Sequence, residues 1–366
     1  MSLNCGIVGL PNVGKSTLFN ALTSTQNAQS ANYPFCTIEP NKGIVNVPDS
    51  RLEKIAEISK SKTILPAKLE FVDIAGLVKG ASKGEGLGNQ FLANIKEVDA
   101  IIHVLRCFED GNIIHVEGSV DPIRDAEIVN LELIMADFES LEKRLPALEK
   151  KAKGGDKNSA EQVDLIKRML PVLQTGNPVR SIDFTEDEQN IVKKMFLMSA
   201  KPVLYVCNVA EDDLENDNEY VKKVQELAKK ENANCVKISA QIEQEVSALE
   251  SAEEKKEFLS ALGLNETGLD KIIKSAFALL GLHTFFTSGP IESRAWTIPI
   301  NTKAPQAAGV IHSDFERGFI AAEVISFNDF IEYQGESKAR DQGKMRSEGK
   351  TYIVKDGDVI LFRFNV

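Results

Sequence analysis

The segment Gly9-Leu-Pro-Asn-Val-Gly-Lys-Ser16 has the spacing of a phosphate-binding loop, because two glycines enclose four residues and Lys-Ser follows. It comes after the apolar run Cys5 to Val8 and before a helical pattern over Thr17 to Leu22, which is the context that this motif requires. In such a loop backbone N–H groups bind phosphate oxygens, Lys15 reaches the β and γ oxygens, and the Ser16 hydroxyl binds Mg²⁺. The residues expected to contact a nucleotide here are Asn12, Val13, Gly14, Lys15, Ser16 and Thr17.

Two later motifs complete a metal and γ-phosphate site. Thr37, within Tyr33-Pro-Phe-Cys-Thr-Ile-Glu-Pro40, can place its hydroxyl on Mg²⁺ when the γ-phosphate is present. Asp73-Ile-Ala-Gly76 ends a strand pattern, so the Asp73 carboxylate can hold the metal's water shell and the Gly76 N–H can approach the γ-phosphate. The predicted metal-binding residues are Ser16, Thr37 and Asp73, the last through water, and the three ordered motifs favour a nucleotide-dependent switch.

The residue after Gly76 is Leu77, where Ras-like enzymes have the glutamine that orients the attacking water. An alkyl side chain cannot hydrogen-bond water, so hydrolysis is slow or another group takes this role. Asn12 could help to hold a monovalent cation such as potassium against the phosphates, and His115 could orient or deprotonate water. The alternatives are a structural turn residue for Asn12 and a histidine at the edge of a packed segment for His115.

Composition indicates a soluble cytoplasmic protein. The 366 residues carry a formal net charge of -11, which argues against indiscriminate binding of nucleic acid, and we expect no DNA partner. No apolar run is long enough to span a membrane, and the phosphate loop begins too early to leave room for a leader. The five cysteines form no Cys-x-x-Cys pair and are expected to be reduced, and the four histidines lack zinc-site spacing.

The pattern of elements predicts an α/β protein with an inserted hairpin and a second module. Apolar runs beginning at Cys5, Leu69, Ala100, Val203 and Cys235 alternate with helical segments, as in a mostly parallel sheet. We expect a discontinuous nucleotide-binding domain over 1–125 and 200–281, and an antiparallel coiled-coil hairpin over 126–199. The short strands of 282–366 predict an α+β domain. Two amphipathic helices packed on the sheet are the alternative to the hairpin.

Basic residues of the C-terminal module alternate with acidic ones between Glu336 and Lys350. Charge alone favours a solvated face over an RNA contact there. The basic members of this mixed face are Lys338, Arg340, Lys344, Arg346 and Lys350.

These motifs, with Gly80-Ala-Ser-Lys-Gly-Glu-Gly-Leu-Gly-Asn89 and Asn208-Val-Ala-Glu211, resemble the YchF type of Obg-related P-loop proteins. The resemblance covers essentially the whole chain. It implies a coiled-coil hairpin and a C-terminal TGS domain of the β-grasp fold, the latter matched by Arg294 to Ile298 and Asp356 to Phe364. It also implies ATP hydrolysis with a hydrophobic residue in place of the catalytic glutamine, and association with ribosomes.

The base can be argued from Asn208 to Glu211. Guanine recognition in this fold uses Asn-Lys-x-Asp, but Val209 stands at the lysine position and Glu211 at the aspartate position. A carboxylate facing adenine would meet the N1 lone pair, so we expect Glu211 to point elsewhere and the Asn208 amide to pair with N7 and the 6-amino group. Adenine is therefore favoured, and the resemblance adds Ser239 and Ala240 to the base pocket.

Three hypotheses follow from the sequence. The first is a monomeric, Mg²⁺-dependent ATPase that binds ATP and ADP and acts as a switch on the ribosome. The second is a slow GTPase of the same fold. The third is an ATP- or ADP-binding adaptor that recruits partners and whose turnover is incidental.

Overall fold

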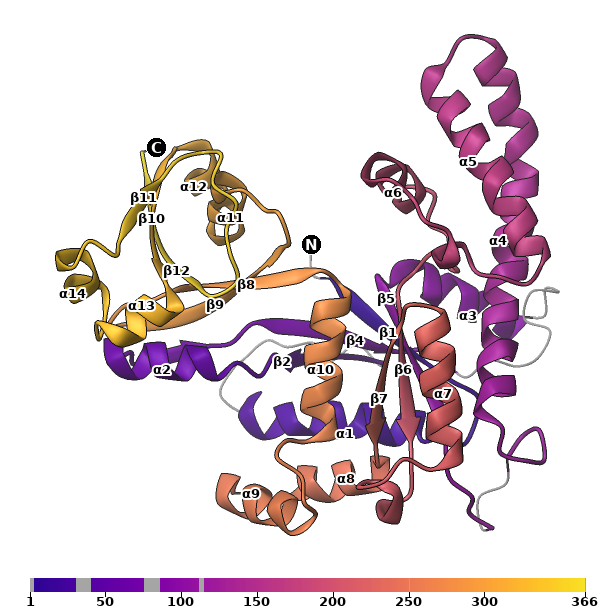
Figure 1. Cartoon of the computed structure of the whole chain (residues 1–366), viewed down its shortest axis with the longest axis horizontal. Coiled ribbons are helices and arrows are strands. Elements are labelled where there is room, and N and C mark those ends of the chain that lie inside the picture. The colour runs from indigo at the N-terminus through magenta and orange to yellow at the C-terminus, as the bar shows by residue number, and fades with distance from the viewer. Residues whose placement is uncertain (1–2, 31–40, 76–85, 112–114, 250, 366) are drawn as a thin grey trace. The chain divides into compact units, whose positions relative to one another are not determined.

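The computed structural model describes residues 3–30, 41–75, 86–111, 115–249 and 251–365, which form two compact units (Figure 1). The first unit contains residues 1–44 and 70–276, and the second contains residues 45–69 and 277–366. Among the described residues, no helix combines the length and the apolar character that crossing a bilayer would need.

A six-stranded sheet in the order β2-β4-β1-β5-β6-β7 organises the first unit. Its strands are β1 (Asn4–Val8), β2 (Lys42–Asn46), β4 (Lys68–Asp73), β5 (Ala100–Arg106), β6 (Val203–Asn208) and β7 (Asn234–Ile238). The pairs β1·β4, β1·β5, β5·β6 and β6·β7 are parallel, and β5 and β6 are buried along their whole length. All five apolar runs seen in the sequence are therefore strands of a parallel sheet. Strand β2 was not predicted, because its alternating exposed and buried residues give a short and weak pattern.

Helices lie between these strands in the chain or follow the last of them. They are α1 (Lys15–Ser30), α3 (Gly86–Glu97), α7 (Glu219–Lys230), α8 (Ala240–Ala248), α9 (Ala252–Ala261) and α10 (Gly268–Leu279). Helix α1 follows β1 and helix α8 follows β7, so both begin at the carboxyl edge of the sheet. Ligands of open parallel sheets bind at this edge, where the loops converge.

A long antiparallel hairpin is inserted between β5 and β6 (Figure 1). It consists of α4 (Pro122–Lys153) and α5 (Lys157–Gln174), and the chain returns through η2 (Val179–Ser181) and α6 (Glu186–Lys193). Asp121 begins α4 by accepting hydrogen bonds from the N–H groups of Ile123 and Arg124. The spacing of Leu131, Ile134, Leu141, Ile166 and Leu173 in the sequence predicts an apolar seam between the two helices. All of these except Leu131, which is exposed, share one core.

Two polar networks hold the base of the hairpin on the first unit. The buried Asp137 carboxylate on α4 accepts hydrogen bonds from the N–H groups of Met198 and Ser199 at 3.0 and 2.7 Å, although burial raises the pKa of this carboxyl. In the second network, Arg180 donates to Asn130 and to Glu231, both at 3.0 Å. Tyr205 of β6 donates to the same Glu231 carboxylate, and Asn130 donates to the Tyr205 hydroxyl. These hydrogen bonds connect the base of the hairpin to β6 and to Glu231, which follows α7.

The second unit contains another six-stranded sheet, in the order β11-β10-β12-β8-β9-β3. Its strands are β3 (Thr63–Leu65), β8 (Leu282–Thr287), β9 (Glu292–Pro299), β10 (Phe319–Ser326), β11 (Arg346–Glu348) and β12 (Asp358–Phe364). Its helices are α2 (Ser50–Ser59), α11 (Ala304–Ile311), α12 (Ser313–Arg317), α13 (Phe327–Glu332) and α14 (Glu336–Asp341). The sheet and α11 share a core around Phe285, Ile298, Ala308 and Phe362. This is the α+β composition expected for the C-terminal module.

Residues 45–69 belong to the second unit, whereas the sequence pattern assigns them to the nucleotide-binding domain over 1–125. Strand β3 instead pairs with β9, and the Arg51 guanidinium of α2 donates to Asp49 and to Asp356 at 2.8 and 2.6 Å. The Arg51 side chain also lies over the Phe286 ring. A second difference is local. The sequence pattern also predicts a short strand over 352–354, but these residues make only an isolated bridge, between Ile353 and Lys303.

Candidate functional site

A cavity of about 550 Å³ lies at the carboxyl ends of β1 and β4 in the first unit. Residues from the predicted phosphate loop and from the end of β4 line it together. The lining consists of Leu10, Pro11, Asn12, Gly14, Lys15, Ser16, Thr17, Asn41, Asp73 and Ala75. Segments about sixty residues apart in the sequence are thus brought together as predicted, and the cavity is large enough for a small polar ligand.

The loop between β1 and α1 contains two residues with left-handed backbone. Asn12 and Gly14 have φ angles of 63° and 92°, in the left-handed region. A Cβ atom added to Gly14 would collide with the Asn208 amide nitrogen, so a side chain at this position is excluded by space as well as by φ. The chain then enters α1 at Lys15, which places free backbone N–H groups beside the cavity.

Lys15 and Asp73 form an ion pair inside this cavity, where both side chains are largely buried. A triphosphate would compete for the Lys15 ammonium and release the Asp73 carboxylate. Ser16 and Asp73 both line the cavity, and a hydroxyl and a carboxylate are the kind of hard oxygen groups that could hold Mg²⁺ there. Thr37 and Gly76 lie outside the described residues, so their predicted roles stay predictions.

Asn208 connects the phosphate loop to the loop after β7. Its Nδ2 atom donates to the Val13 carbonyl oxygen at 2.9 Å, and its Oδ1 atom accepts from the Ala240 N–H at 2.9 Å. The sequence predicts that both ends of this amide face adenine. In the structure each end instead has a partner within the protein, as buried polar groups generally do. One N–H of the amide and the second lone pair of Oδ1 make no further hydrogen bond within the described residues, but Asn208 is 4% exposed, so a ligand would reach them only after a rearrangement.

The other predicted base-pocket residues differ in exposure. The Val209 and Ser239 residues are each 2% exposed, so their side chains are packed within the protein in this conformation. The Val209 N–H donates to the Ile238 carbonyl oxygen at 2.8 Å. Glu211 is exposed at the start of η3 (Glu211–Asp213). Side-chain contacts from Val209 and Ser239 to a base therefore need a rearrangement, whereas Glu211 needs none.

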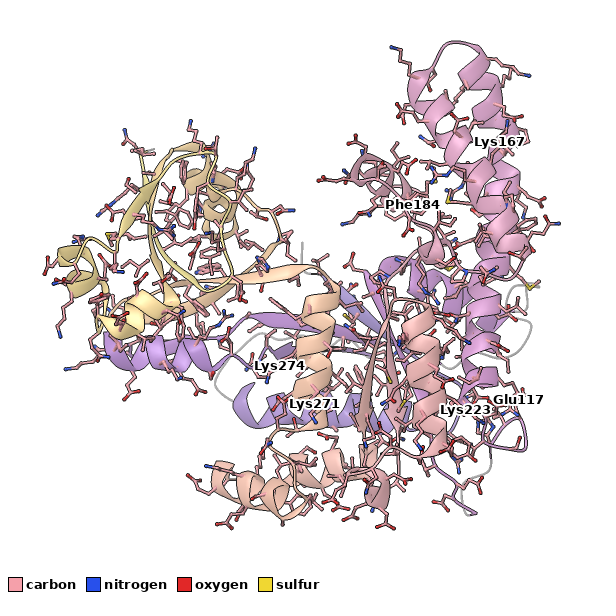
Figure 2. The ribbon with its side chains drawn as sticks, in the orientation of Figure 1. Glu117, Lys167, Phe184, Lys223, Lys271 and Lys274 are labelled. Carbon is pink, nitrogen blue, oxygen red and sulfur yellow. The ribbon has the colours of Figure 1, made fainter. Side chains whose placement is uncertain are left out.

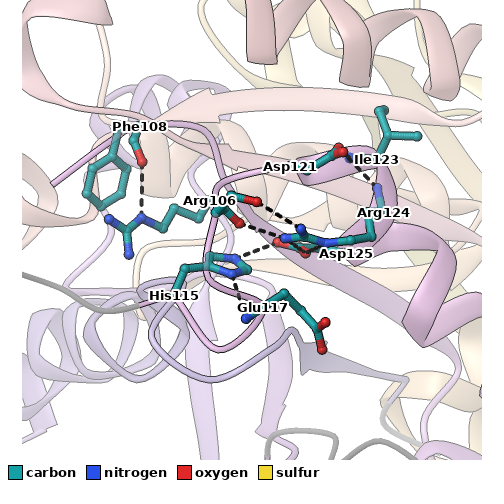
Figure 3. Close-up of polar contacts among 9 residues, drawn as sticks. Arg106, Phe108, His115, Glu117, Asp121, Ile123, Arg124 and Asp125 are labelled. Atoms are coloured by element: carbon teal, nitrogen blue, oxygen red, sulfur yellow. Dashed lines mark hydrogen bonds and ion pairs between the residues drawn. The ribbon is translucent and has the colours of Figure 1, made fainter. Parts of the chain in front are cut away.

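His115 is buried, and both of its ring nitrogens have partners (Figure 3). The Nδ1 atom accepts from the Glu117 N–H at 3.2 Å, which assigns the ring proton to Nε2, 2.8 Å from the Asp125 carboxylate. Asp125 also accepts from Arg124. In this conformation His115 is the packed histidine of the alternative interpretation, and it can bind water through Nδ1 only after the bond to Glu117 breaks.

Arg106 holds the start of the loop that leads to His115 (Figure 3). The guanidinium is buried, donates to the carbonyl oxygens of Phe108 and Asp110, and lies over the Phe108 ring. No motif marked this arginine in the sequence, because its role is to satisfy loop carbonyls rather than to bind a ligand. Asn41, which lines the cavity, was missed for a similar reason, since a lone asparagine after Pro40 is an ordinary loop residue.

Comparisons with known proteins find relatives over the whole chain. A family model described as a 50S ribosome-binding GTPase matches residues 4–145, and one described as a protein of unknown function, YchF-GTPase_C, matches residues 282–365. The ribosome-binding ATPases YchF of Pasteurella multocida and Bacillus subtilis are each 54% identical, with complete coverage of both chains. The solved Schizosaccharomyces pombe YchF GTPase is 40% identical with a TM-score of 0.89, covering 99% of this chain and 98% of that chain.

The double hydrogen bond of Asn208 gives a first testable prediction. Asn208→Ala leaves the Val13 carbonyl and the Ala240 N–H unpaired, so we expect a loss of about 2 kcal/mol in the free energy of unfolding. We also expect nucleotide affinity to fall at least about tenfold, because the two loops lose their connection. Urea unfolding and calorimetric nucleotide titration measure the two effects.

Asn130→Ala is the matched control, since it also removes an amide with two hydrogen bonds, away from the cavity. It should cost similar stability and leave nucleotide affinity unchanged. Equal losses of affinity in both variants would contradict the bridging role of Asn208.

Proposed function

The chain belongs to the YchF family, and from this premise we propose that it is an Mg²⁺-dependent ATPase that acts as a switch on the ribosome. The observation that carries the proposal is the pairing of Lys15 with Asp73 in a cavity that Ser16 also lines. A lysine, a hydroxyl and a carboxylate in this arrangement are the parts that a P-loop hydrolase uses on a triphosphate.

Each residue has a defined task in this proposal. Lys15 stabilises negative charge on the β and γ oxygens, while Ser16, Thr37 and Asp73 position the metal, Asp73 through water. Bound Mg²⁺ supplies charge neutralisation across the phosphate oxygens. Gly76 N–H approaches the γ-phosphate, so that triphosphate orders the segments of Thr37 and Gly76 and hydrolysis releases them. Asn12, on the cavity wall, helps to hold a potassium ion.

The base requires its own argument, because the relatives' names include both ATPase and GTPase. Val209 cannot cover a base as a lysine stem does, and Glu211 is one methylene longer than the aspartate that reads guanine. Asn208 keeps one N–H that can donate to N7 of either purine. Adenine is favoured because no side chain at these positions is placed to accept hydrogen bonds from the N1–H and the exocyclic amine of guanine. Ser239 and Ala240 close the pocket through their backbone.

Calorimetric titration with ATP and GTP analogues that resist hydrolysis tests this assignment. We expect tight Mg²⁺-dependent binding of the ATP analogue and weaker binding of the GTP analogue by about tenfold or more, a difference of at least about 1.4 kcal/mol. A Val209→Lys, Glu211→Asp double variant restores the guanine pattern and should narrow or reverse the preference. Lys15→Ala is the control that should lose both ligands. Preference of the unaltered protein for GTP would establish the slow-GTPase alternative instead.

His115 is proposed as the group that orients the attacking water, in place of the glutamine that Leu77 replaces. The buried Asp125 carboxylate fixes the tautomer, which leaves the Nδ1 lone pair as the base, as in catalytic dyads. The long 3.2 Å hydrogen bond from the Glu117 N–H is the contact that has to open before water can bind. The proposed role therefore requires local rearrangement around His115.

We expect His115→Ala to lower kcat by about a hundredfold or more while ATP affinity is retained, as for loss of a general base. Single-turnover hydrolysis with parallel calorimetry separates the two quantities. Unchanged hydrolysis would remove His115 from catalysis.

The same variant separates the switch from the adaptor. If ribosome binding and the cellular effect survive a complete loss of hydrolysis, the result supports the adaptor hypothesis rather than the switch.

The proposed ribosome contact is the end of the helical hairpin, which we define as Lys150, Lys151, Lys153 and Lys157. All four lysines are exposed, and none forms an ion pair with another part of the chain that the structure describes. Lys167, further along α5, is instead paired with Glu149 at 2.8 Å (Figure 2). Unpaired lysines on a projecting element are suited to RNA phosphates.

The mixed face of the second unit is less suited to RNA. Arg340 contacts Glu336 at 2.7 Å, Lys344 contacts Asp329 at 3.4 Å, and Arg346 contacts Glu348 at 3.6 Å. These cations already have anionic partners, in agreement with the solvated-face interpretation. We propose that the protein works in the cytoplasm, where ribosomes and ATP are both available. We propose further that it is a monomer.

Replacing the four hairpin-end lysines by glutamine should weaken ribosome binding and lower its salt dependence. Each lost phosphate contact reduces the slope of log K against log salt by about 0.7 to 0.9, so the loss of four contacts should reduce it by about three to four. Sedimentation with ribosomes over a series of salt concentrations measures it. The control replaces Arg340, Lys344 and Arg346, which already have anionic partners, in the same way and should change the slope little. The reverse ranking would move the contact to the second unit.

A further inference from the structure

Asn41 lines the phosphate cavity but belongs to none of its motifs. It precedes β2, and its carbonyl oxygen accepts a hydrogen bond from the Asp73 N–H at 2.8 Å. This bond places the Asn41 backbone directly beside the residue proposed to hold the metal's water shell. Asn41 therefore reaches the cavity from the opposite side of Asp73 to Lys15 and Ser16, which belong to the phosphate loop.

The carboxamide of Asn41 is available for a ligand. Asn41 is exposed, and within the described residues its side chain makes no hydrogen bond or ion pair with the protein. An amide oxygen accepts hydrogen bonds from water, and the water bound to a dication is a strong donor. The residue thus offers a neutral acceptor next to the anionic Asp73.

Backbone conformation provides the competing explanation for an asparagine here. Its φ angle of 78° is left-handed, a region that asparagine and glycine tolerate better than other residues. If conformation alone selected the residue, glycine would serve as well, because its backbone can make the same bond to Asp73. The two explanations therefore predict different behaviour for an Asn41→Gly protein.

We propose that Asn41 is a positioning residue for the metal–nucleotide complex, in which its carboxamide hydrogen-bonds a metal-bound water beside Asp73. This inference rests on the proposed function, since it assumes that the cavity binds a triphosphate with Mg²⁺. When the triphosphate draws Lys15 away from Asp73, the carboxylate and the Asn41 amide hold the water shell from adjacent chain segments. Outer-shell partners of this kind orient the ligands that contact a metal.

The test measures binding rather than turnover. Calorimetric titration of a non-hydrolysable ATP analogue is repeated over a series of Mg²⁺ concentrations for the unaltered protein, Asn41→Gly and Asn41→Asp. We expect Asn41→Gly to need about tenfold more Mg²⁺ for half of the full gain in affinity, as for loss of an outer-shell partner. Asn41→Asp tolerates the same backbone angle and keeps an acceptor oxygen, so it should need no more Mg²⁺ than the unaltered protein.

Two controls separate the possible failures. Affinity for the analogue without Mg²⁺, and the thermal midpoint, should be the same in all three proteins. A Gly variant that matches an Mg²⁺-responsive unaltered protein would overturn the role of the carboxamide and leave the proposed function standing. An unaltered protein whose nucleotide binding ignores Mg²⁺ would overturn both.

Discussion

The Asn208 carboxamide is the contact on which the geometry of the site depends. It joins the Val13 carbonyl in the phosphate loop to the Ala240 N–H at the start of α8, and so connects loops that follow β1, β6 and β7. These positions are far apart in the sequence, and only the parallel sheet brings them together. A buried amide with both ends bonded tolerates little displacement, because any shift leaves a polar group unpaired. The absence of a side chain at Gly14 is what allows the amide to come so close.

Charge balance is the second constraint on the cavity. The side chains of Lys15 and Asp73 are mostly removed from water. An isolated charge of either sign is costly in such a buried position, so each side chain neutralises the other. A triphosphate with its metal carries charges of both signs. Its phosphate oxygens can replace Asp73 as the partner of Lys15, and the metal can replace Lys15 as the partner of Asp73. The same physical argument explains why a neutral amide at Asn41 fits beside Asp73 better than another cation would, since a cation there would compete with the metal.

The chain between the two motifs predicted to respond to the γ-phosphate, those of Thr37 and of Asp73 to Gly76, does not stay in the first unit. After Thr37 it runs through β2 into α2 and β3, which belong to the second unit, and it returns along β4 to Asp73. Within the second unit this segment is held by the β3·β9 pairing and by the Arg51 contacts with Asp49 and Asp356. The C-terminal unit is therefore completed by residues that precede most of the nucleotide-binding unit in sequence, and the two units are covalently connected at both ends of 45–69.

Local patterns in the sequence determined five of the six strands of the first sheet, the glycine-rich loop before α1, the position of Asp73 at the end of β4 and the two hairpin helices. Hydrophobic periodicity and glycine spacing are properties of neighbouring residues, so they can be interpreted without knowing the fold. Only the tertiary structure decided that 45–69 belongs to the second unit and that Asn41 lines the cavity. It also decided that the Asn208 amide hydrogen-bonds to the protein and that His115 is held by Asp125 and Glu117. Each of these depends on which distant residue occupies the space next to a side chain, and no local pattern records that information.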